Sequence, residues 1–389
     1  MAHRRMKGLY YITHINNISS ILNRGILSHE IVEKENVPFT RIYNEGIVAN
    51  RRNRLTPDGR SLWSFANLYF QPRNAMLYQV VNEKGLDEIA IVAVRQDILK
   101  RPDIYITTGN AAHSESEILH PREGRQAVAE MLDVLNSDWW KKEDGSKRRM
   151  MAECLVPDVV TPDSIDGIYV SKHTVAEKLK STLPHGKIEV IPALSLFFQP
   201  AQRIALTDRI SIIEGDMFFS RMQTLTISVN CVGVMGKGLA SRAKYQFPDV
   251  YVFYQDLCRD QTLKMGRPYL YKRESSLEQE LAEEPSLESN GNLETWFLLF
   301  PTKNHWREQS DIVGIEKGLE WLVENAADLA IKSLAVPALG CGLGGLEWEQ
   351  VGPLMCRYLA RLGIPVEVYL PAEKKILPTA LTKQFLLKP

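Results

Sequence analysis

The chain has no net charge to draw it toward a polyanion. Its 47 lysine and arginine residues balance 47 aspartate and glutamate residues, so any binding of nucleic acid requires a local basic patch. The five cysteines are scattered without paired metal-ligand spacing, which predicts reduced thiols, a cytoplasmic protein and no metal site. The sequence also lacks an apolar run long enough for a signal peptide or a membrane span, so no membrane partner is expected.

The length and the apolar content predict two domains. A chain of 389 residues with 44% hydrophobic residues can fill two ordinary domain cores but exceeds the usual size of one. The apolar pattern is interrupted at 199–203 and a new strand-like run begins at Ile210. We place the boundary at Ala205, which gives domains at 1–205 and 206–389.

The second half alternates strand-like runs with helical patterns. This alternation predicts an α/β/α domain, with a mixed central sheet flanked by helices on both faces. Residues 274–294 break the pattern, because they are rich in serine and glutamate and contain no aromatic residue. Such a composition predicts a disordered acidic insertion on the surface.

Two glycine-rich loops in this half each follow an apolar run. They read VNCVGVMGKGLA at 229–240 and PALGCGLGGL at 337–346. Glycine lets the backbone come close to a pyrophosphate and point its N–H groups at it. Together the loops predict the two walls of an ADP-ribose pocket.

Three further strings stand out in the second half: EGD at 214–216, FPTKNHWR at 300–307 and GCGLGGLEW at 340–348. They make this half resemble a macrodomain, and the last two are similar to the DarG branch, whose members remove ADP-ribose from DNA bases. The resemblance runs from about 209 to 362. It implies that the aspartate of EGD recognises adenine. The implied ADP-ribose-binding residues are Asp216, Met217, Asn230, Gly233, Val234, Met235, Gly236, Lys237, Gly238, Gly340, Cys341, Gly342, Leu343 and Gly344.

Cleavage of the bond between ribose C1 and a base nitrogen develops positive charge on the ribose and negative charge on the leaving base, and both charges need stabilisation. A lysine beside the ribose can open the sugar ring through an imine or protonate the leaving base. The resemblance assigns this role to Lys303, with Asn230 orienting the ribose. Lys237 in the first glycine loop is the competing candidate, for which we favour a solvated loop position. His305 is assigned a structural role in its loop.

Four strings stand out in the first half: LYYITHINNISSILNRGILS at 9–28, NRRNRLTP at 50–57, LYFQPRNAMLY at 68–78 and RRMMAECLVPD at 148–158. They resemble DarT, a family of ADP-ribosyltransferases that use NAD to modify bases in single-stranded DNA. The resemblance covers about 7–198. It implies an α+β ADP-ribosyltransferase fold.

The candidate catalytic residues of this half are a carboxylate and an arginine. Loss of nicotinamide from NAD leaves an oxocarbenium-like ribose, which a carboxylate can stabilise. Glu153 holds the position of the family's glutamate, and Arg52 matches its catalytic arginine, with Arg51 as the competing position. A guanidinium does not readily give up a proton, so we assign Arg52 to the NAD phosphates and to the anion that develops on the target base.

Further contacts with NAD are predicted in the first and third strings. Tyr69 is a candidate for stacking on nicotinamide or on an unpaired base, with core packing as the alternative, and Phe70 is the weaker candidate. The predicted NAD-binding residues are Tyr11, Ile12, Thr13, His14, Ser20, Arg52 and Tyr69.

These observations predict a fused toxin and antitoxin. The first half attaches ADP-ribose from NAD to single-stranded DNA and the second half removes it, so the expected partners are NAD, single-stranded DNA and ADP-ribosylated DNA. Thymine is the expected base, because the related thymidine-directed transferases are paired with macrodomains. Two alternatives are a protein-directed transferase with an eraser domain and a non-enzymatic ADP-ribose reader on a degenerate transferase. Contact between the domains is left open.

Overall fold

The structure is a computed structural model that describes residues 8–43, 50–183, 188–283, 294–371 and 374–388. The chain forms two compact units: the first runs to Phe198 and takes up the chain again at Glu280, and the second begins at Gln199. The division therefore precedes the predicted boundary at Ala205. The reason is that strand β11 (Gln202–Ala205) pairs with β12 (Ile210–Glu214), so these residues already belong to the second sheet.

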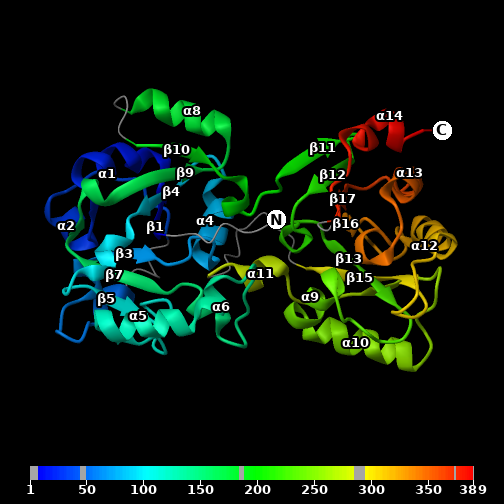
Figure 1. Cartoon of the computed structure of the whole chain (residues 1–389), viewed down its shortest axis with the longest axis horizontal. Helices are drawn as coiled ribbons and strands as arrows, with labels where there is room; N and C mark the ends of the chain where they lie inside the picture. Colours follow the sequence, from blue (N-terminus) through cyan, green and yellow to red (C-terminus); the bar gives the residue numbers. More distant parts are fainter. Residues whose placement is uncertain (1–7, 44–49, 184–187, 284–293, 372–373, 389) are drawn as a thin grey trace. The chain divides into compact units, whose positions relative to one another are not determined.

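The first unit is built on an eight-stranded sheet in the order β10-β9-β4-β1-β3-β7-β5-β6 (Figure 1). All neighbouring strands are antiparallel except β9 and β10. A separate short ladder joins β2 (Ile26–Leu27) to β8 (Val159–Val160). The strands of the main sheet are β1 (Leu9–His14), β3 (Phe65–Tyr69), β4 (Ile89–Val94), β5 (Tyr105–Thr107), β6 (Ile118–Leu119), β7 (Glu153–Pro157), β9 (Ile165–Val170) and β10 (Val190–Pro192).

Helices cover this sheet and complete the α+β fold that the sequence predicts. Every residue of β4 is buried, as expected for a strand with apolar layers on both faces. Helix α4 shows how local sequence sets the ends of a helix: Asn74 accepts the N–H of Leu77 at 3.0 Å, and Gly85 follows the last residue with φ 100°. The helices are α1 (Ile18–Arg24), α2 (His29–Lys34), α4 (Ala75–Lys84), α5 (Pro121–Glu130), α6 (Leu132–Leu135), α7 (Ser146–Arg149) and α8 (His173–Thr182).

The second unit contains a seven-stranded sheet in the order β11-β12-β17-β16-β13-β15-β14. The inner pairs are parallel and the two edge pairs are antiparallel, so the sheet is mixed as predicted. Edge strands that run against the rest are common on such sheets. The remaining strands are β13 (Thr224–Asn230), β14 (Tyr269–Tyr271), β15 (Trp296–Lys303), β16 (Leu334–Pro337) and β17 (Val366–Tyr369).

The alternating side chains of β15 show that helices cover both faces of this sheet. Leu298 and Phe300 join the core that contains α12 and α13, whereas Phe297 packs against Phe247 with ring centroids 4.6 Å apart. The result is an α/β/α unit, as expected. Its helices are α9 (Gly238–Gln246), α10 (Pro248–Arg259), α12 (Ile312–Asn325), α13 (Trp348–Leu359) and α14 (Lys383–Leu386). Helix α11 (Leu277–Leu281) begins in this unit, and its last two residues belong to the first. Within the described residues, no helix has the length and apolarity needed to cross a bilayer.

The acidic stretch at 274–294 is ordered in its first part. Leu277, Leu281 and Ala282 are buried, and the indole N–H of Trp140 donates to the carbonyl of Leu281 at 3.1 Å. From Glu280 this segment belongs to the first unit. The predicted disorder is therefore wrong for 274–283, because three buried apolar side chains are enough to fix a segment whose composition is acidic overall. Residues 284–293 lie outside the described part of the chain.

Candidate active sites

Glu153 begins β7 and lies opposite Tyr69, the last residue of β3. Its side chain is fully buried. The carboxylate accepts two hydrogen bonds from Arg51, at 3.2 and 2.9 Å, and one from the backbone N–H of Ala111 at 2.9 Å. A bidentate pair with arginine and a backbone donor stabilise the ionised form of a carboxyl group. Arg51 and the backbone of Ala111 therefore fix the position of the Glu153 carboxylate.

Of the two candidate arginines, Arg51 is the one that contacts Glu153. Burial opposes the charge of Arg51, but the charge and hydrogen bonds of Glu153 outweigh it and raise the pKa of Arg51. Arg52 is exposed, pairs with Glu33 at 2.6 Å and lies over the ring of Trp63, 4.6 Å from its centroid. The two neighbouring arginines thus have separate surroundings.

A cavity lies beside this pair. Arg51 lines it and also holds Glu153, which does not itself line the cavity. Most of the predicted NAD-binding residues line it as well, namely Tyr11, Ile12, Thr13, Ser20 and Tyr69. Arg52 and His14 do not. His14 instead ends β1, where its Nδ1 accepts the N–H of Asn16 at 3.1 Å and its Nε2 lies 3.3 Å from Glu88.

Several residues of the cavity are not among the predicted NAD-binding residues. The side chain of Asn17 bonds to Thr13 at 3.1 Å and to both backbone groups of Thr40, at 2.9 and 2.7 Å, and so fixes the segment at 37–43. His29 lines the same cavity and stacks on Trp63, with ring centroids 4.4 Å apart. Burial, followed by the charge of Arg51, lowers the pKa of His29 to about 4.

The ordered part of the acidic stretch contributes a carboxylate to the cavity. Glu283 lines it and accepts a hydrogen bond from Asn110 at 2.6 Å. Burial raises the pKa of Tyr69 well above its usual value, and the charges of Glu153 and Glu283 add to the effect. The first unit thus includes a polar group that lies 173 residues from its partner in the sequence.

In the second unit, the predicted ADP-ribose residues gather at the carboxyl ends of neighbouring parallel strands. Asn230 ends β13 and is in register with Lys303 at the end of β15. The first glycine-rich loop follows β13, and the second follows the adjacent strand β16. Ligands of open α/β sheets bind at this edge.

Asn230 fixes the first glycine-rich loop from within. Its side-chain amide donates to the carbonyl of Val234 at 2.6 Å, and its oxygen accepts the N–H of Val232 at 3.0 Å and the hydroxyl of Tyr254 at 2.8 Å. Asn230 is buried, and Tyr254 is fully enclosed. The predicted ribose-orienting residue therefore engages the loop itself, and the partnership with Tyr254 leaves no sequence signal.

The two candidate lysines differ in their surroundings. Lys303 is half-buried, and its Nζ donates to the carbonyl of Glu308 at 2.7 Å. Burial lowers the pKa of Lys303, and the charge of Glu308 partly offsets this. Lys237 is exposed at the start of α9. A lysine with a lowered pKa is better suited to act as a nucleophile or a proton donor near neutral pH.

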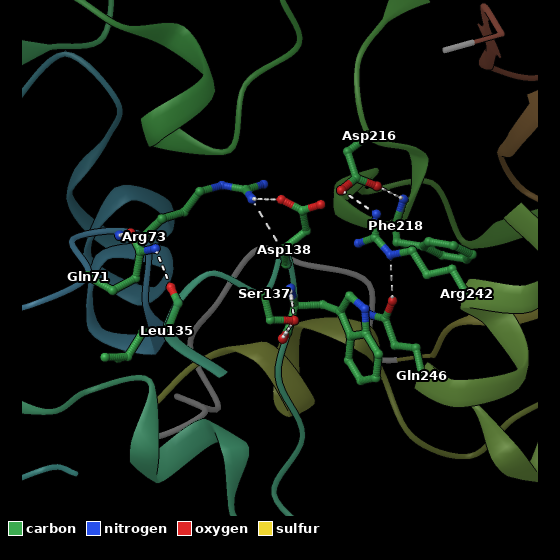
Figure 2. Close-up of polar contacts among 10 residues, drawn as sticks. Gln71, Arg73, Leu135, Ser137, Asp138, Asp216, Phe218, Arg242 and Gln246 are labelled. Atoms are coloured by element: carbon green, nitrogen blue, oxygen red, sulfur yellow. Dashed lines mark hydrogen bonds and ion pairs between the residues drawn. The ribbon is translucent and has the colours of Figure 1, made fainter. Parts of the chain in front are cut away.

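Asp216 is held by a residue that the sequence does not single out (Figure 2). Its carboxylate accepts the N–H of Phe218 at 3.1 Å and a guanidinium N–H of Arg242 at 2.7 Å. Arg242 also donates to Gln246 at 3.2 Å and lies 4.9 Å from the ring centroid of Phe218. These contacts fix the orientation of the predicted adenine-recognising carboxylate.

The second glycine-rich loop requires glycine for steric reasons. Gly340 has a φ of 72°, and a Cβ there would lie 2.7 Å from Leu346. At Gly344 a Cβ would meet the hydroxyl of Ser310 at 2.4 Å. The loop is therefore packed closely by its surroundings, while Leu343 is 59% exposed at its tip.

Comparisons with known proteins identify the family. Residues 10–198 match the family model of the ssDNA thymidine ADP-ribosyltransferase DarT, and residues 287–355 match that of the macro domain. The chain is 57% identical over 385 residues to a DNA ADP-ribosyl transferase-DNA ADP-ribosyl glycohydrolase fusion protein of Thermosipho africanus, which covers 98% of this chain and 99% of the relative. The chain belongs to the DarTG fusion family.

Two further comparisons agree with this assignment. The solved structure of Thermosipho africanus DarTG in complex with ADP-ribose matches with a TM-score of 0.92 and covers 98% of this chain and 100% of that one. A DNA ADP-ribosyl glycohydrolase of Thermus aquaticus is 36% identical over 162 residues, or 41% of each chain. Membership of the family confirms the predicted pairing of an NAD-dependent DNA ADP-ribosyltransferase with an ADP-ribosyl-DNA glycohydrolase.

Proposed function

We propose that the first unit of this DarTG protein attaches ADP-ribose to thymine in single-stranded DNA, and that the second unit removes it. The observation that carries this proposal is the buried Glu153–Arg51 pair beside a cavity that Tyr11, Thr13 and Tyr69 line. It combines an anion for the ribosyl cation with a cation for the phosphates of NAD. The alternative of a degenerate transferase does not account for such a pair.

The transfer begins when the bond between ribose and nicotinamide breaks and its electrons leave with nicotinamide. The carboxylate of Glu153 stabilises the resulting ribosyl cation. Arg51 has to release part of its contact with Glu153, and the pyrophosphate of NAD offers it a second anionic partner. A base nitrogen then forms a bond to C1 of the ribose, and its proton passes to water. We therefore move to Arg51 the phosphate and base-anion roles first assigned to Arg52.

The removal reaction uses the edge of the second sheet. The two glycine-rich loops hold the pyrophosphate, Asp216 meets adenine, and Lys303 acts at the distal ribose. Two chemistries remain for Lys303, opening of the ring through an imine and protonation of the leaving base. Release that quickens with rising pH and levels below the usual lysine pKa supports the imine, since only the neutral amine attacks. Release that slows with rising pH supports proton donation.

Thymine in an unpaired strand fits the demands of the site. An unpaired base avoids the cost of flipping a nucleotide out of a duplex. The assignment of thymine follows the specificity named for the matching DarT family model. We place the reaction in the cytoplasm, where NAD and DNA meet and where the five unpaired cysteines stay reduced.

The test uses the full chain with Lys303→Ala, so that the product accumulates. This variant is incubated with NAD and either of two oligonucleotides, one with a single thymine and one with cytosine in its place. Mass spectrometry is expected to show one added ADP-ribose on the thymine strand alone, and the unsubstituted protein is expected to remove it. Equal labelling of both strands contradicts the choice of thymine, and labelling of protein in place of DNA contradicts the substrate class.

A further inference from the structure

The loop after β15 presents two side chains that the proposed reactions leave unused. In the string FPTKNHWR, Lys303 is followed closely by Trp306 and Arg307. Trp306 is 48% exposed, and Arg307 is exposed as well. The guanidinium of Arg307 lies 4.6 Å from the centroid of the indole, and the ring of His305 lies 5.4 Å from it. An aromatic ring and a cation therefore share one surface beside the candidate lysine.

Hydrogen bonds within the loop hold this surface in place. Lys303 donates to the carbonyl of Glu308 at 2.7 Å, and the N–H of Glu308 donates to the carbonyl of His305 at 3.0 Å. The N–H of His305 donates to the carboxylate of Glu308 at 3.1 Å, and the N–H of Arg307 donates to Nδ1 of His305 at 3.3 Å. The lysine and the exposed indole thus belong to one closed turn.

We propose that Trp306 and Arg307 bind the DNA strand next to the ADP-ribosylated base while the second unit removes the modification. The inference rests on the proposed function, because the bond that Lys303 acts on joins ADP-ribose to the strand. The two glycine-rich loops take the ADP-ribose side of that bond, so the DNA side meets the turn that carries the lysine. The indole stacks on a flanking base, and Arg307 faces a phosphate.

The chemistry of this surface favours a nucleic acid over a protein partner. Every base has a flat face that an indole can stack against, so the contact is independent of sequence. A strand also supplies a negative charge at each nucleotide for the guanidinium, which makes the contact sensitive to salt. A peptide that carries ADP-ribose offers neither feature at a fixed spacing.

The test compares two substrates of the full chain, in the absence of NAD. One is an ADP-ribosylated oligonucleotide and the other is ADP-ribosylated thymidine, which has no flanking base. Trp306→Ala is expected to raise KM for the oligonucleotide by about 5- to 100-fold, with little change in kcat and less than about twofold change for the nucleoside. Trp306→Phe should restore part of the loss. Arg307→Ala should weaken the dependence of oligonucleotide KM on salt.

A matched control is Tyr245→Ala on α9. Tyr245 is 58% exposed and has the ammonium of Lys244 5.6 Å from its ring centroid, so it too is a surface aromatic beside a cation. It should leave both substrates unaffected. Equal losses of Trp306→Ala on both substrates, or none on either, overturn the inference while the proposed function stands. Failure of the unsubstituted chain to release ADP-ribose from either substrate instead overturns the proposed function.

Discussion

The two candidate catalytic side chains lie in opposite environments. Glu153 is fully buried and ion-paired with Arg51, whereas Lys303 is half-buried and bonded to a backbone carbonyl. Removing one member of a buried ion pair leaves an uncompensated charge, so it costs stability as well as activity. Removing a half-buried lysine leaves only a carbonyl that water can reach. Glu153 is thus part of the structural core of its unit, whereas Lys303 contributes little to the stability of the unit that carries it.

The largest expected effect is at the carboxylate. Glu153→Gln should lower the rate of DNA labelling by about 100- to 1000-fold, because the amide cannot stabilise the ribosyl cation by charge. Removal of ADP-ribose from a pre-modified oligonucleotide should remain at the rate of the unsubstituted chain. Mass spectrometry of both reactions measures this, and unimpaired labelling by the variant defeats the assignment.

The next effect is at the lysine. Lys303→Ala should slow the release of ADP-ribose by at least about 100-fold and make the chain toxic in growing cells, while the free energy of unfolding changes by less than about 0.5 kcal/mol. Lys237→Ala, at the exposed competing position, tests the alternative assignment. A greater loss for the control than for Lys303→Ala would transfer the role to Lys237.

The two arginines separate stability from surface charge. Arg51→Met should lower the free energy of unfolding of the first unit by about 3–5 kcal/mol, because Glu153 stays buried without its partner. Arg52→Met should cost less than about 1 kcal/mol, since its pair with Glu33 is exposed. Denaturant unfolding measures the loss of stability in both variants. The rate of DNA labelling should also fall more in Arg51→Met than in Arg52→Met. The reverse order returns the catalytic role to Arg52.

The smallest expected effect is the loss of folding stability at acidic pH that His29 causes. The pKa of His29 is lowered to about 4 in the folded chain from 6.5, so between these values the unfolded chain binds a proton that the folded one does not. Its contribution to stability is present above pH 6.5 and is lost as the pH falls through this window, by an amount on the order of 1–3 kcal/mol. His29→Asn should flatten this part of the stability curve. The exposed His173→Asn serves as the control and should follow the unsubstituted chain.

The sequence could predict those parts of the sites that lie in contiguous strings. Glu153, Lys303 and both glycine-rich loops fall at strand ends, where a short motif fixes the position of a side chain. The choice between Arg51 and Arg52 could not be made this way. They are consecutive residues of a helical turn at 50–53, so their side chains leave it in different directions.

Contacts between residues that are distant in the sequence could not be predicted either. Tyr254 meets Asn230 across 24 residues, and Arg242 meets Asp216 across 26. Nothing in either local pattern encodes such a meeting, because it depends on how helices pack on the sheet. The prediction of disorder in the acidic stretch failed for a related reason. It rested on the average composition, which is acidic, although a few apolar residues of the stretch are buried.

The return of the chain to the first unit at Glu280 has a practical consequence. A fragment that stops at Phe198 would lack the carbonyl of Leu281 that Trp140 contacts and the carboxylate of Glu283 at Asn110. Cutting the chain after Phe198 would therefore remove part of the lining of the cavity from the isolated transferase. Single substitutions in the full-length chain leave this lining in place, so they allow the transferase and glycohydrolase activities to be compared.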